Sequence, residues 1–291
     1  MKILITGAKG FLGSAFVNEL AKAGKHEIIA LVKDAGQHYD AVKYISADLS
    51  NSSFTDNIPG TADCVIYLAQ SNQYRNFPSG APDLFAVNTA AVASLLDWSS
   101  KNGVKKFIYA STGNVYEPRQ ELLKETHSTR PNSFYAASKL SAELLVQSYS
   151  GTFDTIVLRV FSLYGPGQQG MMIPGIIQKI YNSDPIALAE NAGIYLTPLY
   201  ISDAVKMLTL ISEQPVSSGI YNLCGPETAS LMEIVKILSD KIGKTPILNI
   251  TTNTPAWLAG DGSKLYQSIN FKPETTLKEG LSLTIDQYKH D

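Results

Sequence analysis

Tyr135 and Lys139 are the two side chains whose types and spacing best suit proton transfer. They stand four residues apart, which places both on one face of a helix. An unperturbed tyrosine has a pKa of about 10, so an ionised phenolate at neutral pH needs a shift of about three units, or roughly 4 kcal/mol. A neighbouring ammonium group favours the phenolate by Coulomb attraction. The pair is therefore typical of general acid–base chemistry.

The position of this pair in the chain strengthens the interpretation, because a Tyr-Lys pair at this spacing is by itself a weak signal. Ser111 and Thr112 end an apolar run that begins as Lys106–Ala110 and that we expect to be a strand, and Thr112 precedes Tyr135 by 23 residues. Doubly wound sheets bind their ligands at the carboxyl ends of such strands. We therefore expect Tyr135 and Lys139 to face a ligand.

A glycine-rich turn follows the first expected strand and opens a helix. It reads GAKGFLG over residues 7–13, a GxxGxxG pattern. In a dinucleotide site the first glycine makes the tight turn, the second lets the backbone approach a pyrophosphate, and the third lets helix and strand pack closely. The amides at the helix N-terminus then face the anion. The expected cofactor contacts of this turn are Gly7, Gly10, Phe11, Leu12 and Gly13.

The end of the second expected strand bears on the choice between NAD and NADP. An acidic residue there holds the adenosine ribose of NAD, whereas a cation accommodates the 2′-phosphate of NADP. Val32 stands at the acidic position and Lys33 follows it, so we expect NADP to be favoured, while Asp34 keeps NAD open. Asp48 and Leu49 follow the third strand and are candidates for contact with the adenine. The end of the fourth strand adds three candidates beside the phosphates, namely Leu68, Ala69 and Gln70.

The elements that position these residues alternate through the first 160 residues. Apolar runs of strand length alternate with segments of helical period, which is typical of βα units around a parallel sheet. The expected strands are Lys2–Thr6, Glu27–Val32, Lys43–Ser46, Cys64–Leu68, Lys106–Ala110 and Thr155–Phe161. The expected helices include Phe11–Ala23, Leu84–Lys101 and Ser133–Ser150. The fold class is therefore α/β, with a Rossmann-type doubly wound parallel sheet.

A different organisation is expected after Phe161, where the alternation becomes irregular and six glycines and prolines gather between residues 165 and 175. We expect residues 1–161 to form a Rossmann dinucleotide-binding domain, with segments near 203–224 returning to it. Within those segments 203–213 is expected to be a helix and 219–224 a strand. Residues 162–202 and 225–291 are expected to form a smaller, mixed α/β substrate-binding domain.

Composition narrows the class of protein. The 24 Lys and Arg nearly balance the 26 Asp and Glu, so a net charge of −2 gives no drive toward nucleic acid or an anionic membrane. No segment has about 18 apolar residues in a row, and the N-terminus lacks the features of a signal peptide. The two cysteines, Cys64 and Cys224, form neither a metal cluster nor a disulfide framework. We expect a soluble cytoplasmic protein that carries no metal.

Several further motifs accompany the glycine turn and the Tyr-Lys pair, among them ADL, YLAQ, YASTGNVY, YAASK, LRVFSLYGPGQ, PLYISDAV and YNLCGPETASL. Together they resemble the extended short-chain dehydrogenase/reductases of the NAD(P)-dependent epimerase/dehydratase family, which modify nucleotide sugars. The resemblance implies a catalytic triad of Thr112, Tyr135 and Lys139, in which Thr112 hydrogen-bonds a substrate oxygen and Lys139 also contacts the nicotinamide ribose. It also implies that Asp48 meets the adenine, and that the chain forms a homodimer through the two helices expected near residues 84–101 and 133–150.

Departures from the family pattern bear on the reaction and the substrate. The sugar-nucleotide 4,6-dehydratases carry Asp-Glu after the catalytic threonine, where this chain has Gly113 and Asn114, which argues against dehydration. Leu196 stands where an arginine typically clamps the substrate diphosphate, and the chain has four arginines in all. Because arginine favours bidentate phosphate recognition, this scarcity weakens the case for a standard nucleoside-diphosphate sugar. The candidate substrate contacts are Arg75, Asn114, Ser162 and Tyr164.

Three functions remain open from the sequence. The first is an NAD(P)-dependent reductase or dehydrogenase that transfers a hydride at a keto or hydroxyl carbon of a sugar or nucleotide sugar. The second is a nucleotide-sugar epimerase that oxidises and reduces one carbon with a retained NAD. The third is a protein that senses a dinucleotide without catalysis, against which the presence of Tyr135 and Lys139 argues.

Overall fold

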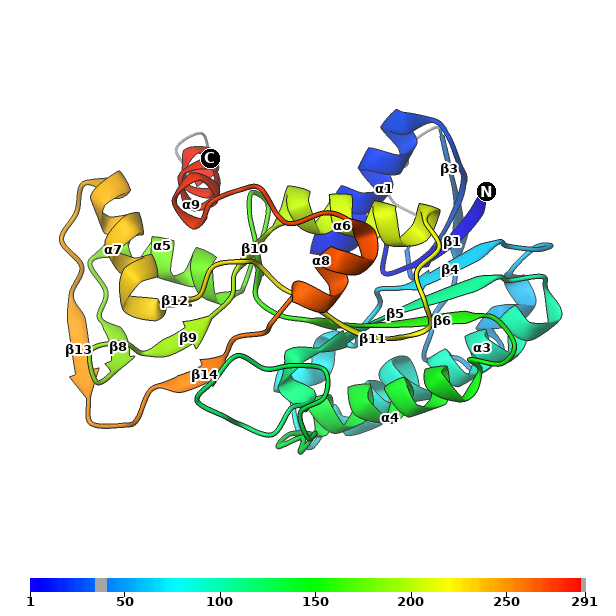
Figure 1. Ribbon diagram of the computed structural model, residues 1–291, viewed down its shortest axis with the longest axis horizontal. Coiled ribbons are helices and arrows are strands. Elements are labelled where there is room, and N and C mark those ends of the chain that lie inside the picture. Colours follow the sequence, from blue (N-terminus) through cyan, green and yellow to red (C-terminus); the bar gives the residue numbers. More distant parts are fainter. Residues whose placement is uncertain (35–40, 289–291) are drawn as a thin grey trace. The chain divides into compact units, whose positions relative to one another are not determined.

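The computed structural model describes residues 1–34 and 41–288 (Figure 1). A seven-stranded, mostly parallel sheet has the strand order β11-β6-β5-β4-β1-β2-β3. Because β1 pairs with β2 on one side and with β4 on the other, the direction of winding reverses between β1 and β4. This is the Rossmann-type doubly wound sheet that the sequence predicts, and ligands of such sheets bind at the carboxyl ends of the strands at this reversal. Its strands are β1 (Lys2–Thr6), β2 (Glu27–Val32), β3 (Val42–Ser46), β4 (Cys64–Tyr67), β5 (Lys106–Thr112), β6 (Asp154–Val160) and β11 (Gly219–Leu223).

Helices cover both faces of this sheet, which is why its central strands are apolar along their whole length. Figure 1 shows α1 (Phe11–Ala23) and α6 (Ile201–Glu213) over one face, with α3 (Ala91–Lys101) and α4 (Phe134–Ser148) over the other. Four short segments connect these elements: η1 (Phe54–Asn57), η2 (Asn72–Arg75), α2 (Ala81–Phe85) and η4 (Gly113–Val115).

The expected strands are present: β1 and β2 have the expected boundaries, and those of β3, β4, β5 and β6 shift by one or two residues. The largest shift is at β5, which continues beyond Ala110 so that Ser111 and Thr112 are its last two residues. The expected return of the chain to the sheet is also present, because β11 forms its edge beside β6. α4 begins after Ser133, whose side-chain oxygen accepts a hydrogen bond from the Ala136 amide at 3.2 Å, as expected of an N-cap.

The expectation of one continuous helix over Leu84–Lys101 is wrong. A π-helical turn, η3 (Ala86–Ala90), separates α2 from α3. A π turn changes the backbone hydrogen-bond pattern, and here two buried hydroxyl groups bond its carbonyls: Tyr67 donates to Val87 O at 2.5 Å and Tyr109 donates to Asn88 O at 3.4 Å. Both tyrosines belong to strands of the sheet, so the local sequence of the helix carries no sign of the turn.

The chain divides into two compact units. The first comprises residues 1–117, 128–159 and 205–221, and the second comprises 118–127, 160–204 and 222–291. The second unit has its own apolar core, to which Ile177, Leu188 and Leu238 contribute. Its sheets are β10-β7, β12-β9-β14 and β13-β8. Its elements are β7 (Leu163–Tyr164), α5 (Met172–Asn182), β8 (Ile186–Ala189), β9 (Ile194–Leu196), β10 (Leu199–Tyr200), β12 (Ala229–Ser230), α7 (Leu231–Ile242), β13 (Leu248–Thr251), β14 (Ala256–Leu258), α8 (Ser263–Ile269) and α9 (Leu277–Tyr288).

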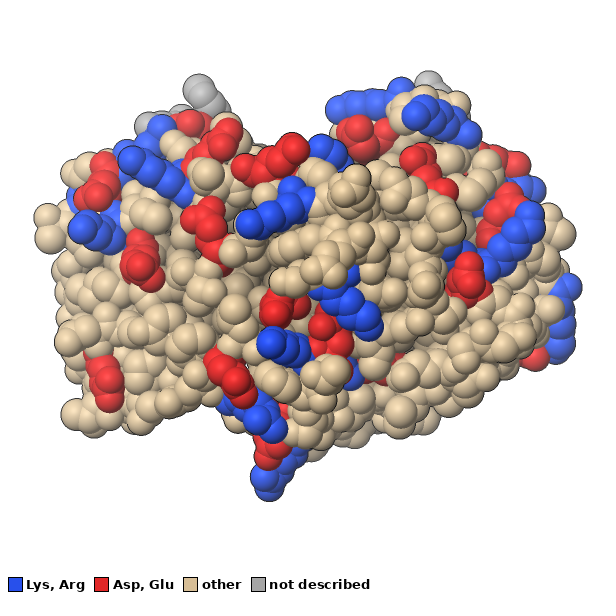
Figure 2. Space-filling model, viewed as in Figure 1, with Lys and Arg blue, Asp and Glu red and all other residues tan. Residues whose placement is uncertain are grey.

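Charged side chains of both signs are interspersed on the face of the molecule seen in Figure 2. Among the described residues, no helix is long and apolar enough to cross a membrane. The same part of the chain holds no group of three or more His, Cys, Asp or Glu placed to bind a metal ion. Cys64 and Cys224 are both buried and free.

Candidate active site

Lys139 is buried beneath the end of the sheet, with 2% of its surface exposed. Its Nζ donates hydrogen bonds to the carbonyl oxygens of Ala110 at 2.9 Å and Ala69 at 3.5 Å, and lies 5.1 Å from the centre of the Tyr109 ring. Burial lowers the pKa of Lys139 to about 7, and the carboxylate of Glu143 partly opposes this change. The ammonium group is therefore easily deprotonated near neutral pH.

Tyr135 lies one helical turn before Lys139, as the spacing predicts. Its hydroxyl group donates a hydrogen bond to Oε1 of Gln70 at 3.1 Å. Burial raises the pKa of Tyr135 to about 12, and a hydrogen bond with Thr112 lowers it in part. This differs from the sequence-based expectation that Lys139 lowers the pKa of the phenol. The reason is that burial dominates, while the Nζ of Lys139 is directed at two backbone carbonyls.

Thr112 is positioned by its own local turn. Its Oγ1 accepts hydrogen bonds from the backbone amide of Asn114 at 3.2 Å and from Asn114 Nδ2 at 3.1 Å. These bonds cap η4 and use the acceptor capacity of the hydroxyl, so its own hydrogen is oriented away from them. Thr112 is buried, whereas the Asn114 side chain is exposed beside it. The turn therefore presents a threonine hydroxyl as a donor near Tyr135.

A buried ion pair lies behind Lys139. Arg159 Nη2 is 2.7 Å from Glu143 Oε2, its Nε also donates to both carboxylate oxygens, and the Ser111 hydroxyl donates to Glu143 Oε1. The Arg159 guanidinium lies 4.5 Å from the centre of the Tyr116 ring. This network links α4, β5 and β6, and it supplies the negative charge that faces Lys139. Its residues lie on three separate elements, so no local sequence signal reveals the network.

The glycine turn is shaped by the end of β4. Gly7 has a positive φ of 70°, and a Cβ at this position would lie 2.7 Å from the backbone nitrogen of Ala69. A Cβ on Gly13 would overlap the carbonyl oxygen of Gly7.

Gly10 is the N-cap of α1, whose first amides lack helical partners and suit an anion. Phe11 and Leu12 occupy this first turn. At the end of β4, the Leu68 amide donates to the Thr6 carbonyl oxygen at 3.3 Å, and the Ala69 amide donates to Thr6 Oγ1 at 3.2 Å.

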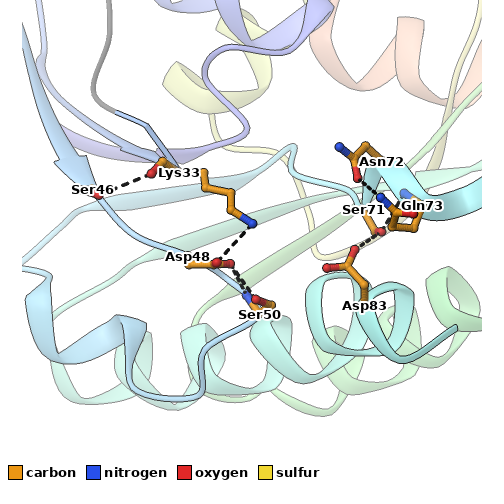
Figure 3. A network of polar contacts seen from close by, with 8 residues as sticks. All are labelled: Lys33, Ser46, Asp48, Ser50, Ser71, Asn72, Gln73 and Asp83. Carbon is orange, nitrogen blue, oxygen red and sulfur yellow. Dashed lines mark hydrogen bonds and ion pairs between the residues drawn. The ribbon is translucent and has the colours of Figure 1, made fainter. Parts of the chain in front are cut away.

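The candidate adenosine contacts form a separate polar network, drawn in Figure 3. Lys33 Nζ lies 3.1 Å from Asp48 Oδ2, and Ser50 donates to Asp48 Oδ1 through its amide at 3.0 Å and its hydroxyl at 2.7 Å. These hydrogen bonds and the Lys33 charge lower the pKa of Asp48. The Lys33 side chain remains 76% exposed, and Leu49 follows Asp48 with a partly buried side chain that packs against the core. Lys33 is therefore accessible to a ligand although it is paired.

Asn88 is a residue that our sequence reasoning did not assign to the site. Its Oδ1 accepts from the amide of Ser71 at 3.0 Å, and its Nδ2 donates to the hydroxyl of Ser138 at 3.1 Å. Thr89 donates to the Ser138 carbonyl at 3.0 Å. Ser138 immediately precedes Lys139, so these hydrogen bonds hold the π turn against α4 beside Tyr135 and Lys139. A lone buried asparagine within an apolar helix is the only signal in the sequence.

The four candidate substrate contacts lie in different environments. The Arg75 guanidinium lies 5.0 Å from the centre of the Tyr74 ring, which is itself 5.9 Å from the Tyr135 ring. Asn114 stands beside Thr112 as described above. Ser162 and Tyr164 belong to the second unit, where Ser162 is partly buried and Tyr164 is 1% exposed.

The chain is similar over its full length to proteins of one enzyme class. It is 29% identical over 304 residues to the uncharacterized UDP-glucose epimerase YtcB of Bacillus subtilis, covering 97% of this chain and 96% of that protein. It is 29% identical to UDP-glucuronate 4-epimerase of Thermodesulfobacterium geofontis, covering 99% and 96%. A crystal structure of UDP-glucuronic acid 4-epimerase from Bacillus cereus, in complex with UDP-glucuronic acid and NAD, matches with a TM-score of 0.87, 25% identity and coverage of 100% and 99%.

The doubly wound fold and these matches define an enzyme of the extended short-chain dehydrogenase/reductase class. The model of the NAD dependent epimerase/dehydratase family matches residues 3–224, and the chain belongs to that family. The resemblance inferred from the motifs is thereby confirmed. The choice between epimerase and reductase, the preference for NADP and the homodimer stay predictions.

Proposed function

We propose that this enzyme is a nucleotide-sugar epimerase, which inverts one hydroxyl-bearing carbon of the sugar through a transient ketone. One observation carries the proposal: Ala69 lies between the two halves of the site. Its backbone nitrogen would lie 2.7 Å from a Cβ on Gly7, and its carbonyl oxygen accepts a hydrogen bond from Lys139 Nζ at 3.5 Å. The glycine turn and the acid–base pair therefore adjoin the same residue at the reversal of the sheet.

The glycine turn fits a dinucleotide because it has no room for side chains and presents the free amides of α1. Gly7, Gly10 and Gly13 would hold the pyrophosphate, and Lys139 would contact the nicotinamide ribose. When bound, NAD supplies an acceptor and a donor for the hydride of the sugar carbon. These assignments follow the family pattern at the matching positions.

Tyr135 is the proposed acid–base group. In its ionised form, the phenolate takes the proton of the sugar hydroxyl as the carbon is oxidised, and the resulting phenol returns that proton as the carbon is reduced. Thr112 donates its hydroxyl hydrogen to the same sugar oxygen and holds that oxygen within reach of the phenol. The pKa of Tyr135, which burial raises to about 12, favours the protonated form, so positive charge brought to the site must favour the ionised form.

The local sequence favours epimerisation over dehydration. Relatives similar over nearly the whole chain are named as epimerases, at 29% identity, and as dTDP-glucose 4,6-dehydratases, at 24% and 25%, so the choice between the two reactions rests on the residues of this chain. Elimination of water needs a further acid and base beside the threonine, and Gly113 and Asn114 supply neither. Besides the hydride transfer to and from the sugar carbon that bound NAD would supply, epimerisation needs only the proton transfer between the sugar oxygen and Tyr135.

A net reduction with NADP is the second candidate function. It is favoured by Lys33, whose exposed ammonium group at the end of β2 would contact the 2′-phosphate of NADP. The ion pair with Asp48 weighs against it, because the same carboxylate would repel that phosphate. Lys33→Ala is expected to weaken the binding of NADPH much more than that of NADH. An equal loss for both cofactors would remove this candidate.

We propose a nucleotide sugar as the substrate, since UDP-glucuronic acid is bound in the Bacillus cereus enzyme to which this chain is similar. Leu196 stands where the family carries an arginine, and its side chain is buried in the core of the second unit. The diphosphate would therefore be recognised by other groups, for which Arg75 is our candidate. Weaker binding of the diphosphate than in typical family members is expected.

The test is to incubate the purified protein and NAD with UDP-glucose and with UDP-glucuronic acid, and to follow the sugar by NMR. We expect a 4-epimer to form with no net change in NADH absorbance. Tyr135→Phe should lower kcat at least about 100-fold while NAD still binds. Tyr149→Phe, at the end of the same helix, is the matched control and should retain activity. A fully active Tyr135→Phe variant would exclude the proposed role, and net consumption of NADPH would favour the reductase.

We also propose that the protein is a homodimer that acts in the cytoplasm. The dimer is implied by the family resemblance, and the helices concerned expose apolar side chains, Phe85 at 55% and Leu144 at 63%. Sedimentation equilibrium should give twice the chain mass. Leu144→Glu should yield a monomer if α4 lies in the interface, and a wild-type monomer would refute the proposal.

A further inference from the structure

Gln70 reaches the catalytic phenol from the end of β4. Its Oε1 accepts the hydrogen bond of the Tyr135 hydroxyl at 3.1 Å. The backbone before it is held at both ends, because the Ala69 amide donates to Thr6 Oγ1 at 3.2 Å and the Ala69 carbonyl accepts from Lys139 Nζ at 3.5 Å. The side chain therefore starts from a fixed point beside the proposed acid–base group.

We propose that Gln70 is a further catalytic residue, whose side-chain amide hydrogen-bonds the hydroxyl oxygen of Tyr135 in both its neutral and its ionised form. The inference rests on the function proposed for Tyr135. A carboxamide carries an acceptor oxygen and an NH2 group with two donor hydrogens. The oxygen accepts from the neutral phenol, as the structure has it. A half turn of the amide about its terminal torsion presents Nε2 instead, which donates to the phenolate.

Thr112 cannot fill this role throughout the reaction. Its Oγ1 already accepts two hydrogen bonds from Asn114, and its single hydrogen is needed by the substrate oxygen. The hydrogen bond with Thr112 that lowers the pKa of Tyr135 would thus be given up to the substrate, while the amide of Gln70 stays beside the phenolate and stabilises it. A hydrogen bond to an ionised group is roughly twice as strong as one between neutral groups, so the amide stabilises the phenolate more than the phenol. Gln70 thus opposes the effect of burial on Tyr135.

Three titratable groups of the first unit face Tyr135 from the elements around it. They are Tyr74 on η2, Tyr109 on β5 and Lys139 on α4. Tyr74 raises the pKa of Tyr135, Tyr135 in turn raises the pKa of Tyr109, and Lys139 directs its hydrogen bonds to backbone carbonyls. None of the three is hydrogen-bonded to the Tyr135 hydroxyl among the interactions described, whereas Gln70 is.

The experiment compares Gln70→Met and Gln70→Glu with the matched control Gln73→Met, whose side chain bonds to Asn72 and Asn76 on the same loop. The pKa of Tyr135 is measured in the NAD-saturated protein by NMR of isotope-labelled tyrosine, with the Tyr135→Phe variant assigning the signal. Gln70→Met should raise this pKa by about 0.5 to 1 unit, from the difference between a neutral and a charge-assisted hydrogen bond. Gln70→Glu should raise it more, because a carboxylate cannot donate and repels the phenolate.

The kinetic expectation separates this role from substrate binding. With a nucleotide sugar, Gln70→Met should lower kcat about 3- to 10-fold at neutral pH, shift the pH profile upward and leave KM unchanged. An unchanged pKa of Tyr135 would overturn the inference, as would a raised KM with an unchanged pH profile, which would make Gln70 a substrate contact. A wild-type enzyme without turnover would refute the epimerase proposal, and the NMR titration would still decide the role of Gln70.

Discussion

Replacing Glu143 by Gln removes the negative half of a buried ion pair while preserving the shape of the side chain. Arg159 Nη2 lies 2.7 Å from Glu143 Oε2, and the two side chains are 3% and 0% exposed. Removing one partner of such a pair leaves the other charge buried without compensation, which costs about 3 to 5 kcal/mol. We expect Glu143→Gln to lower the free energy of unfolding by about that amount, against a typical total of roughly 5 to 15 kcal/mol.

The same substitution acts on Lys139, which we propose to be part of the acid–base machinery. The Glu143 carboxylate raises the pKa of Lys139 and so opposes burial, which brings that pKa to about 7. Without the carboxylate the pKa of Lys139 falls further, and a smaller fraction of the ammonium form remains at neutral pH. If the ammonium form is the active one, the activity of Glu143→Gln at pH 7 should be reduced and should recover as the pH is lowered.

The free energy of unfolding is measured by urea titration, and the pH profile of kcat by the epimerase assay. Asp97→Asn is the control for loss of a surface pair, since Asp97 and Lys101 are mostly exposed and such pairs contribute about 0 to 1 kcal/mol. The double variant Glu143→Leu with Arg159→Met removes both buried charges and should recover most of the lost stability. A Glu143→Gln variant within about 1 kcal/mol of the wild type would refute the reasoning.

Three further predictions concern the glycine turn and two buried lysines. Gly13→Ala places a methyl group against the backbone of the turn and should abolish NAD binding by calorimetry, whereas Gly151→Ala, with no heavy atom within 4 Å of the added carbon, should bind normally. Lys106→Met removes three hydrogen bonds from Nζ to carbonyl oxygens at the end of α6, and it should lower the free energy of unfolding in urea by about 2 kcal/mol. The control is Lys105→Met, whose exposed side chain should contribute less than about 0.5 kcal/mol. A Lys106→Met variant that loses as little stability as this control would contradict the prediction. Burial lowers the pKa of Lys139 from 10.5 to about 7, so between these pH values the unfolded chain binds more protons than the folded chain. The free energy of unfolding of the wild type, measured relative to that of Lys139→Met, should therefore rise by about 1.4 kcal/mol per pH unit from about pH 7 to about pH 9. A difference between the two proteins that does not change with pH would be inconsistent with a lowered pKa of Lys139.

The features of this protein that depend on local spacing were predicted well from the sequence. The glycine turn is one, because the steric demands on Gly7 and Gly13 come from a strand-to-helix connection that the motif itself encodes. The shared helical face of Tyr135 and Lys139 is another, since it follows from 3.6 residues per turn. The strands were found because burial on both faces requires continuous apolar runs.

Features that join distant segments were not predicted. The π turn of Ala86–Ala90 is bonded by hydroxyl groups of Tyr67 and Tyr109, which come from two strands of the sheet. The hydrogen bond between Tyr135 and Gln70 joins residues 65 positions apart, and the sequence had suggested Gln70 only as a cofactor contact. Nothing in the periodicity of a helix or strand specifies such a partner.

The sequence by itself determined the class of fold and the types of side chain available for acid–base chemistry, because both follow from patterns of short range. Only the tertiary structure decided the pKa values of those side chains. Burial raises the pKa of Tyr135 to about 12 and lowers that of Lys139 to about 7, although Thr112 and Glu143 oppose these changes. The desolvation depends on elements that pack around the two side chains from distant parts of the sequence, which no single stretch of sequence contains.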